Sequence, residues 1–214
     1  MKKKIINLFK IIGYLLLPFL LSYIFTNTLT LIGISDYNII KNLAVIVSPL
    51  LFLLSYIILQ IIRNDKIIDK NDFKLEKNDI KKVIMITLIS LGINFLIALI
   101  FINKIQRQDT LEILDSMNIW LARLTGIILA PICEEFYFRK GFYKLFDNKN
   151  LYVIISGIFF GIIHYSPGNS NFTNIVLVST ISLMGMMFCY VYKKEKRISM
   201  TIIPHFINNI LAML

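Results

Sequence analysis

Residues 43–62 of the chain read LAVIVSPLLFLLSYIILQII, a stretch of twenty residues without a charged side chain. A helix that crosses a membrane needs about 20 apolar residues, because the hydrocarbon core is about 30 Å thick and a helix rises about 1.5 Å per residue. The stretch therefore predicts a membrane-spanning helix. It also indicates that lipid is the solvent for this part of the chain.

Six further apolar stretches flank this one, and together the seven predict an all-α, polytopic membrane helical bundle. A hydrophobic content of 57% agrees with this class, since soluble domains carry about 45–50%. The length of 214 residues suits a single transmembrane domain, residues 1–214, whose first stretch we expect to be an uncleaved anchor. The further stretches are Ile5–Phe25, Val83–Ile102, Asn118–Phe146, Leu151–His164, Phe172–Tyr192 and Ile198–Leu214.

The formal net charge of +10 raises the question of nucleic-acid binding, but the cations collect at the ends of apolar stretches. Lys and Arg are concentrated in alternate loops, which by the positive-inside rule places those loops and the N-terminus in the cytoplasm. The cation-rich segments are 2–4, 63–82, 139–149 and 193–197. We therefore expect a multi-pass protein of a cell membrane, with lipid and not nucleic acid as its surroundings. The sequence gives no oligomeric state.

Two local features carry packing expectations. The loop Arg63–Lys82 mixes cations with carboxylates, and we expect it to be a solvated connection that can hold a short surface helix. Gly157 and Gly161 form a small-xxx-small pair, which predicts close approach of a neighbouring helix.

Two adjacent carboxylates, Glu134 and Glu135, occur inside the apolar stretch 118–146. Ionisable groups at such depth are costly in free energy and therefore usually mark a functional site. The chain has two histidines, His164 and His205, and both also fall in apolar stretches. The sequence thus indicates a buried polar site built by three helices.

Partners recur in these stretches at a spacing of four residues, which puts each pair on one face of a helix. The pairs are Glu135 with Arg139, Phe160 with His164, and His205 with Asn209. Glu134 lies about 100° around the helix from Glu135 and faces another neighbour. Counted from the expected cytoplasmic helix ends, the depths are about 16 Å for Glu134, about 20 Å for His164, about 10 Å for His205 and about 16 Å for Asn209. We expect these four groups to converge on one layer.

A carboxylate, two imidazoles and a carboxamide supply what peptide hydrolysis requires, namely an activated water and donors for the oxyanion. Glu134 can act as general base, while His164 orients the same water or returns a proton to the leaving amine. His205 and Asn209 can donate to the oxyanion, where one well-placed group contributes about 3 to 4 kcal/mol. The sequence therefore predicts cleavage of a membrane-associated or hydrophobic peptide.

The ordered triple Glu134-Glu135-x-x-x-Arg139, Phe160-x-x-x-His164 and His205-x-x-x-Asn209 resembles the signature motifs of the CAAX protease and bacteriocin-processing family, also called the Abi family. The resemblance covers about half of the chain, from about residue 118 to 214. It implies an intramembrane endopeptidase in which Glu134 and His164 activate water and His205 and Asn209 form the oxyanion site. Glu135, Arg139 and Phe160 would support them. Members in eukaryotes trim prenylated CAAX proteins, and bacterial members are linked to bacteriocin immunity, peptide maturation and signalling.

Several alternatives stay open. We expect no cofactor, yet Glu134, His164 and His205 could instead form a two-histidine, one-carboxylate zinc site. The polar cluster could belong to a non-enzymatic bacteriocin immunity protein, or to the proton path of a transporter. Asn208 could replace Asn209, although it shares the face of His205 less closely. Cys133 could be a nucleophile, but no basic group is placed to activate it.

Overall fold

The computed structural model describes residues 2–101, 118–165 and 170–213, and these ranges are helical, with no strand among them. The separate helices are α1 (Lys2–Leu31), α2 (Tyr37–Arg63), the short η1 (Lys70–Phe73), α3 (Asp79–Phe101), α8 (Lys149–Ile162), α9 (Asn171–Glu195) and α10 (Ser199–Met213). One continuous helical run comprises α5 (Ile119–Leu124), η2 (Thr125–Leu129), α6 (Ala130–Glu134), η3 (Glu135–Gly141) and α7 (Phe142–Leu145). The described part of each expected apolar stretch coincides with one of these regions to within about six residues at either end, so the all-α membrane bundle is confirmed. Ile102 and Leu214, which end two of the expected stretches, lie outside the described residues.

Three helical segments of the described ranges are long and apolar enough to cross a membrane, namely Phe9–Leu31 in α1, Asn38–Arg63 in α2 and Asn171–Glu195 in α9. Their ends follow local capping chemistry. The Asp36 side chain accepts hydrogen bonds from two backbone N–H groups at the start of α2, and Lys196 ends α9 in a left-handed conformation with φ 57°.

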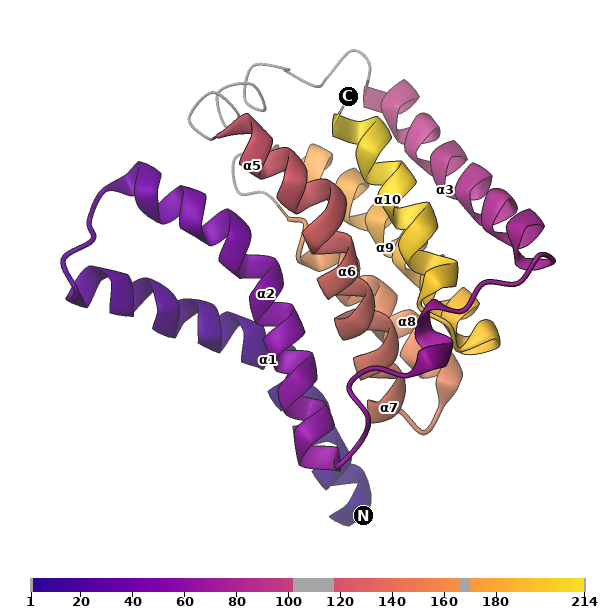
Figure 1. Ribbon diagram of the computed structural model, residues 1–214, viewed down its shortest axis with the longest axis horizontal. Helices are drawn as coiled ribbons and strands as arrows, with labels where there is room; N and C mark the ends of the chain where they lie inside the picture. The colour runs from indigo at the N-terminus through magenta and orange to yellow at the C-terminus, as the bar shows by residue number, and fades with distance from the viewer. Residues whose placement is uncertain (1, 102–117, 166–169, 214) are drawn as a thin grey trace.

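The helices form two groups that meet along the run from α5 to α7 (Figure 1). The turn between α1 and α2 lies far from the other helices. The opposite end of this hairpin, near the start of α1, approaches them. On the other side of the run lie α8, α9 and α10, with α3 packed beside α10. The run that carries the two adjacent glutamates therefore contacts both groups.

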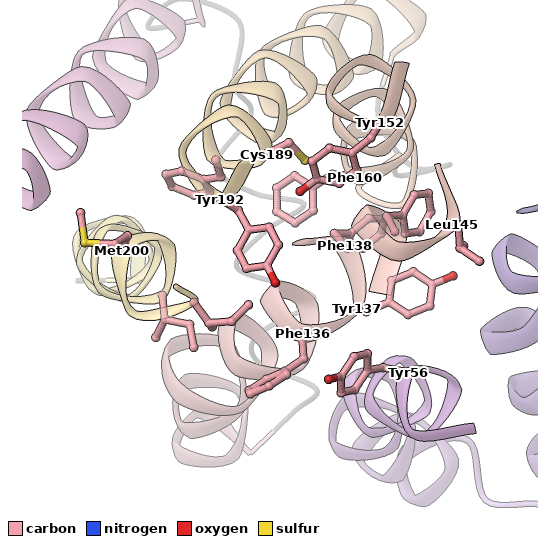
Figure 2. Packing of buried hydrophobic residues seen from close by; sticks show 14 of the residues in the cluster. Tyr56, Phe136, Tyr137, Phe138, Leu145, Tyr152, Phe160, Cys189, Tyr192 and Met200 are labelled. Atoms are coloured by element: carbon pink, nitrogen blue, oxygen red, sulfur yellow. The ribbon is translucent and has the colours of Figure 1, made fainter. Parts of the chain in front are cut away.

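Aromatic side chains join the two groups where they meet (Figure 2). Tyr14 of α1 and Tyr137 of η3 stack with ring centroids 4.5 Å apart. The Tyr137 hydroxyl donates to the Tyr14 carbonyl at 2.7 Å, and the Tyr14 hydroxyl donates to the Tyr137 carbonyl at 3.3 Å. Phe138 lies edge-on to Phe160 of α8 at 5.3 Å. This core fixes η3, and hence Glu135 and its neighbours, against both groups of helices.

The close approach expected at Gly157 and Gly161 is confirmed in the contact between α8 and α9. A Cβ atom on Gly161 would lie 2.4 Å from the carbonyl oxygen of Val178, and one on Gly157 would lie 2.7 Å from the backbone nitrogen of Met186. Backbone atoms cannot move away as a flexible side chain can, so only glycine fits at these two positions.

The expected solvated connection over residues 63–82 is confirmed, since most of its residues are exposed and it holds the short helix η1, but two of its carboxylates, Asp72 and Asp79, are buried. Asp72 is 2% exposed and pairs with Lys140 of η3, and Asp79 is buried against Arg197 with two short bonds of 2.5 and 3.0 Å. Asp72 also accepts from the Asp69 backbone N–H, which stabilises the turn η1. The loop folds over the ends of the helices because its carboxylates find cations there.

Candidate functional site

The two adjacent glutamates lie where the long helical run changes its winding. Its segments η2 and η3 are π-helical, and they flank the short α6. Pro131 stands at the start of α6 and has no N–H to donate, so the preceding turn is free to widen. π-helical turns inside α-helices occur frequently at functional sites. Here the second one begins at Glu135 and contains Arg139.

Glu135 and Arg139 form a fully buried ion pair. Arg139 Nε lies 2.9 Å from Glu135 Oε2, and Arg139 Nη2 lies 3.0 Å from Glu135 Oε1, with both side chains at 0% exposure. The guanidinium also stacks over the Phe160 ring at 4.6 Å and donates to Cys189 Sγ at 3.4 Å. The spacing of four residues therefore does produce the expected contact, and Phe160 covers it.

His205 of α10 contacts both adjacent carboxylates. Its Nδ1 atom lies 3.1 Å from Glu135 Oε1, and its Nε2 atom lies 3.7 Å from Glu134 Oε2. A carboxylate that is paired with Arg139 accepts hydrogen bonds, so Nδ1 of His205 carries a proton. The imidazole is thereby oriented with Nε2 toward Glu134. The sequence argument had expected Glu134 and His205 to converge, but it had paired Glu135 with Arg139 and had not foreseen that His205 also contacts Glu135.

His164 lies just beyond the end of α8, and its Nδ1 atom is 2.7 Å from the carbonyl oxygen of Phe160. A carbonyl can only accept, so Nδ1 donates and the Nε2 atom of a neutral ring is left as an acceptor. The Phe160 ring lies against both imidazoles, with centroids 5.1 Å from His164 and 5.7 Å from His205. One aromatic residue thus holds the two histidines in place.

Glu134, His164, His205 and Asn209 all line one cavity of about 360 Å³. The expected convergence of these four side chains therefore occurs in the fold. Asn209 donates through Nδ2 to the carbonyl oxygen of Gly126 at 2.7 Å, which engages one of its two N–H bonds. Glu134 also borders two cavities of about 310 and 430 Å³ on the side of α2, so its carboxylate faces open space in more than one direction.

Two further carboxamides line the same cavity, and the sequence argument had considered only one of them. Asn208, which had been set aside in favour of Asn209, lines the cavity beside it, and Asn94 of α3 reaches the cavity from outside the three motifs. Their signal was present, because an asparagine inside an apolar span is itself unusual. Cys133 is fully buried and is not among the residues that line this cavity.

Within the described ranges, no three histidine, cysteine, aspartate or glutamate side chains are grouped as metal ligands would be. The zinc alternative at Glu134, His164 and His205 therefore stays a hypothesis for which a chelation experiment is decisive.

Comparison with known proteins agrees with the motifs. Residues 116–211, a little under half of the chain, match the family described as "Type II CAAX prenyl endopeptidase Rce1-like". The resemblance to the CAAX protease family is confirmed. This Rce1-like segment (residues 116–211) contains all three motifs. Of the Asn, Glu and His residues that line the 360 Å³ cavity, it contains all except Asn94.

Three relatives show how far the similarity extends. "UPF0177 protein YbdI" of Lactococcus lactis subsp. lactis (strain IL1403) is 29% identical over 51% of this chain and 58% of its own length. "UPF0177 protein YajF" of the same strain is 26% identical over 54% of this chain and 58% of its own length. "Putative membrane peptidase YdiL" of Bacillus subtilis (strain 168) is 30% identical over 49% of this chain and 41% of its own length. The chain thus spans about half the length of these relatives. No solved structure matches it.

Proposed function

We propose that this protein is an intramembrane endopeptidase that hydrolyses a peptide bond of a membrane-associated or hydrophobic peptide. The observation that carries the proposal is the shared cavity of Glu134, His164, His205 and Asn209, with His205 Nε2 3.7 Å from Glu134 Oε2. The match of the Rce1-like segment and the printed name of the Bacillus subtilis relative support the same reaction class.

In the proposed reaction, Glu134 takes a proton from a water molecule, and the resulting hydroxide attacks the carbonyl carbon of the peptide. A water at about 2.8 Å from both Glu134 Oε2 and His205 Nε2 is compatible with their separation. The C–N bond then breaks, and the proton passes to the leaving amine. In the neutral form of His164, Nε2 is a hydrogen-bond acceptor, which suits the ring to orient the same water or to relay that proton.

The oxyanion that forms in this step needs donors, and two side chains of the cavity can supply them. Asn209 keeps one N–H bond beyond the one given to Gly126. His205 donates from Nε2 when its ring carries both protons, with Glu135 fixing the ring through Nδ1. The ion pair of Glu135 and Arg139 supports this arrangement from outside the cavity, since neither residue is among those that line it.

The bacterial relatives and the cation-rich loops support a place in a bacterial cytoplasmic membrane. The partners that follow from the proposal are membrane lipid and a peptide or protein substrate.

The test compares peptides released by membranes that contain the intact protein with those from the Glu134→Gln variant, by mass spectrometry. Glutamine keeps the shape of the side chain and removes the base, so we expect loss of specific peptides by about 10²- to 10⁴-fold. Glu76→Gln is the matched control, because Glu76 is exposed and lies in the loop between α2 and α3.

Identical peptides from the intact protein and Glu134→Gln would overturn the proposal and favour a role in binding alone. Activity that survives exhaustive chelation would remove the zinc alternative.

A further inference from the structure

Two carboxamides on one wall of the cavity have no part in the three motifs. Asn94 of α3 and Asn208 of α10 both line the cavity, and Asn94 Nδ2 donates to Asn208 Oδ1 at 3.2 Å. Asn94 lies before residue 116 and therefore outside the Rce1-like segment. The pair brings polar groups of α3 to the cavity that holds Glu134.

The hydrogen bonds of Asn208 are poorly satisfied for so buried a group. Its side chain is 2% exposed, and its Nδ2 atom donates to Met184 Sδ at 3.6 Å. A thioether is a weak acceptor, so this contact replaces little of the hydration that the amide loses on burial. A buried donor without a good partner costs about 1 to 3 kcal/mol. The wall of the cavity therefore presents donor capacity that a ligand with a carbonyl group could use.

A peptide substrate inside a membrane creates a matching demand. The bond to be cleaved must leave its helix, and each backbone N–H or C=O group freed in hydrocarbon costs several kcal/mol unless it finds a partner. A carboxamide carries N–H donors and a C=O acceptor, as a peptide group does. It can therefore pair with a freed backbone N–H group and with a freed backbone C=O group. Charged side chains would do this at a far higher cost of burial.

We propose that Asn94 and Asn208 form a subsite that binds the backbone amide groups of the substrate beside the bond that is cleaved. This inference rests on the proposed function. It makes the two asparagines positioning residues that recognise the unwound main chain and not a particular side chain, and it extends the site to α3.

The test uses a synthetic peptide that spans a cleavage site found in the comparison with Glu134→Gln. A second set of the same peptide replaces one backbone amide at a time, on either side of that site, by an ester, which removes the N–H donor and leaves a carbonyl oxygen that accepts hydrogen bonds more weakly. These peptides are cleaved by the intact protein, by Asn94→Leu and by the control Asn27→Leu. Asn27 is an exposed carboxamide of α1 that bonds only within its own helix, to the Tyr23 carbonyl, among the contacts described.

We expect Asn94→Leu to raise KM about 5- to 10-fold, the equivalent of one hydrogen bond, with a smaller effect on kcat. At least one ester replacement should weaken cleavage by the intact protein and by Asn27→Leu. Asn94→Leu should cleave that ester peptide and the all-amide peptide equally well. A purely structural link between α3 and α10 would instead lower stability and leave the ester effect as large as in the intact protein. That result overturns the inference.

Asn94→Leu leaves the Asn208 oxygen without its donor, so it can impair folding. The double variant Asn94→Leu with Asn208→Leu removes both partners and leaves no unpaired amide, which is often close to neutral for stability. Loss of the ester effect in the double variant supports the subsite, and its persistence rejects it. If Glu134→Gln abolishes cleavage but the asparagine variants keep KM and the ester effect, the inference alone fails. If no cleavage depends on Glu134, both the proposed function and this inference fail.

Discussion

The Nε2 atom of His205 lies 3.7 Å from Oε2 of Glu134, on a ring whose Nδ1 atom contacts Glu135 at 3.1 Å. The two adjacent glutamates therefore differ in environment. Glu135 is enclosed with Arg139, while Glu134 faces cavities on both sides of its helix. The division agrees with a supporting role for Glu135 and a chemical role for Glu134.

The two histidines should act as a unit if they serve one water and one transition state. We expect His164→Gln and His205→Gln each to lower kcat by about 10²- to 10³-fold. The double variant should be about as slow as the slower single variant, because such effects are not additive. Single-turnover cleavage of a synthetic substrate measures this. Losses that multiply in the double variant would assign the histidines to independent steps.

Arg139→Met should destabilise the fold by about 3 to 5 kcal/mol, because it leaves the Glu135 carboxylate buried without its partner. Glu135→Leu combined with Arg139→Met should recover much of that loss, since no unpaired charge then remains. Denaturant titration in detergent micelles measures the free energy of unfolding. A double variant as unstable as Arg139→Met alone would contradict the argument.

Gly161→Ala should separate α8 from α9 and lower stability by about 1 to 3 kcal/mol. The new Cβ atom would lie 2.4 Å from the Val178 carbonyl oxygen. Gly13→Ala is the matched control, because no described atom lies within 4 Å of its Cβ position and alanine favours a helix. Thermal unfolding of both variants in micelles tests the difference, and equal midpoints would refute it.

Asp72→Ala should release the loop between α2 and α3, because Lys140 is then buried without its carboxylate. We expect a loss of about 3 kcal/mol and faster hydrogen exchange of the backbone amides in residues 64–78. Lys66→Ala is the control. The Lys66 side chain is 82% exposed in its ion pair with Asp69, so its replacement should change the free energy of unfolding by less than about 1 kcal/mol. Unchanged exchange in Asp72→Ala would show that other contacts hold the loop.

The ion pair between Asp79, at the start of α3, and Arg197, in the connection between α9 and α10, should weaken in acid. The Arg197 guanidinium holds the pKa of Asp79 below its ordinary value through two hydrogen bonds. A lowered folded-state pKa stabilises the fold above the unfolded value of about 4, and this contribution is lost as the pH falls below it. The difference in thermal midpoint between the intact protein and Asp79→Asn should therefore shrink below about pH 4. A difference that stays constant with pH would exclude this cause.

The sequence by itself determined the helices and the pairs within them. In hydrocarbon each backbone group must be satisfied inside its own helix, so an apolar stretch such as 43–62 becomes helical whatever its neighbours are. Spacing along one helix likewise fixes local contacts, and the ion pair of Glu135 with Arg139 could be predicted from four residues of separation.

Only the tertiary structure decided which helix faces meet. The contact of His205 with both glutamates, the approach of Asn94 from α3, and the docking of Asp72 onto Lys140 join residues that are distant in the chain. No local periodicity encodes such contacts, because they depend on how close two helices can come, as at Gly161 against Val178, and on which charges must be paired once water is excluded.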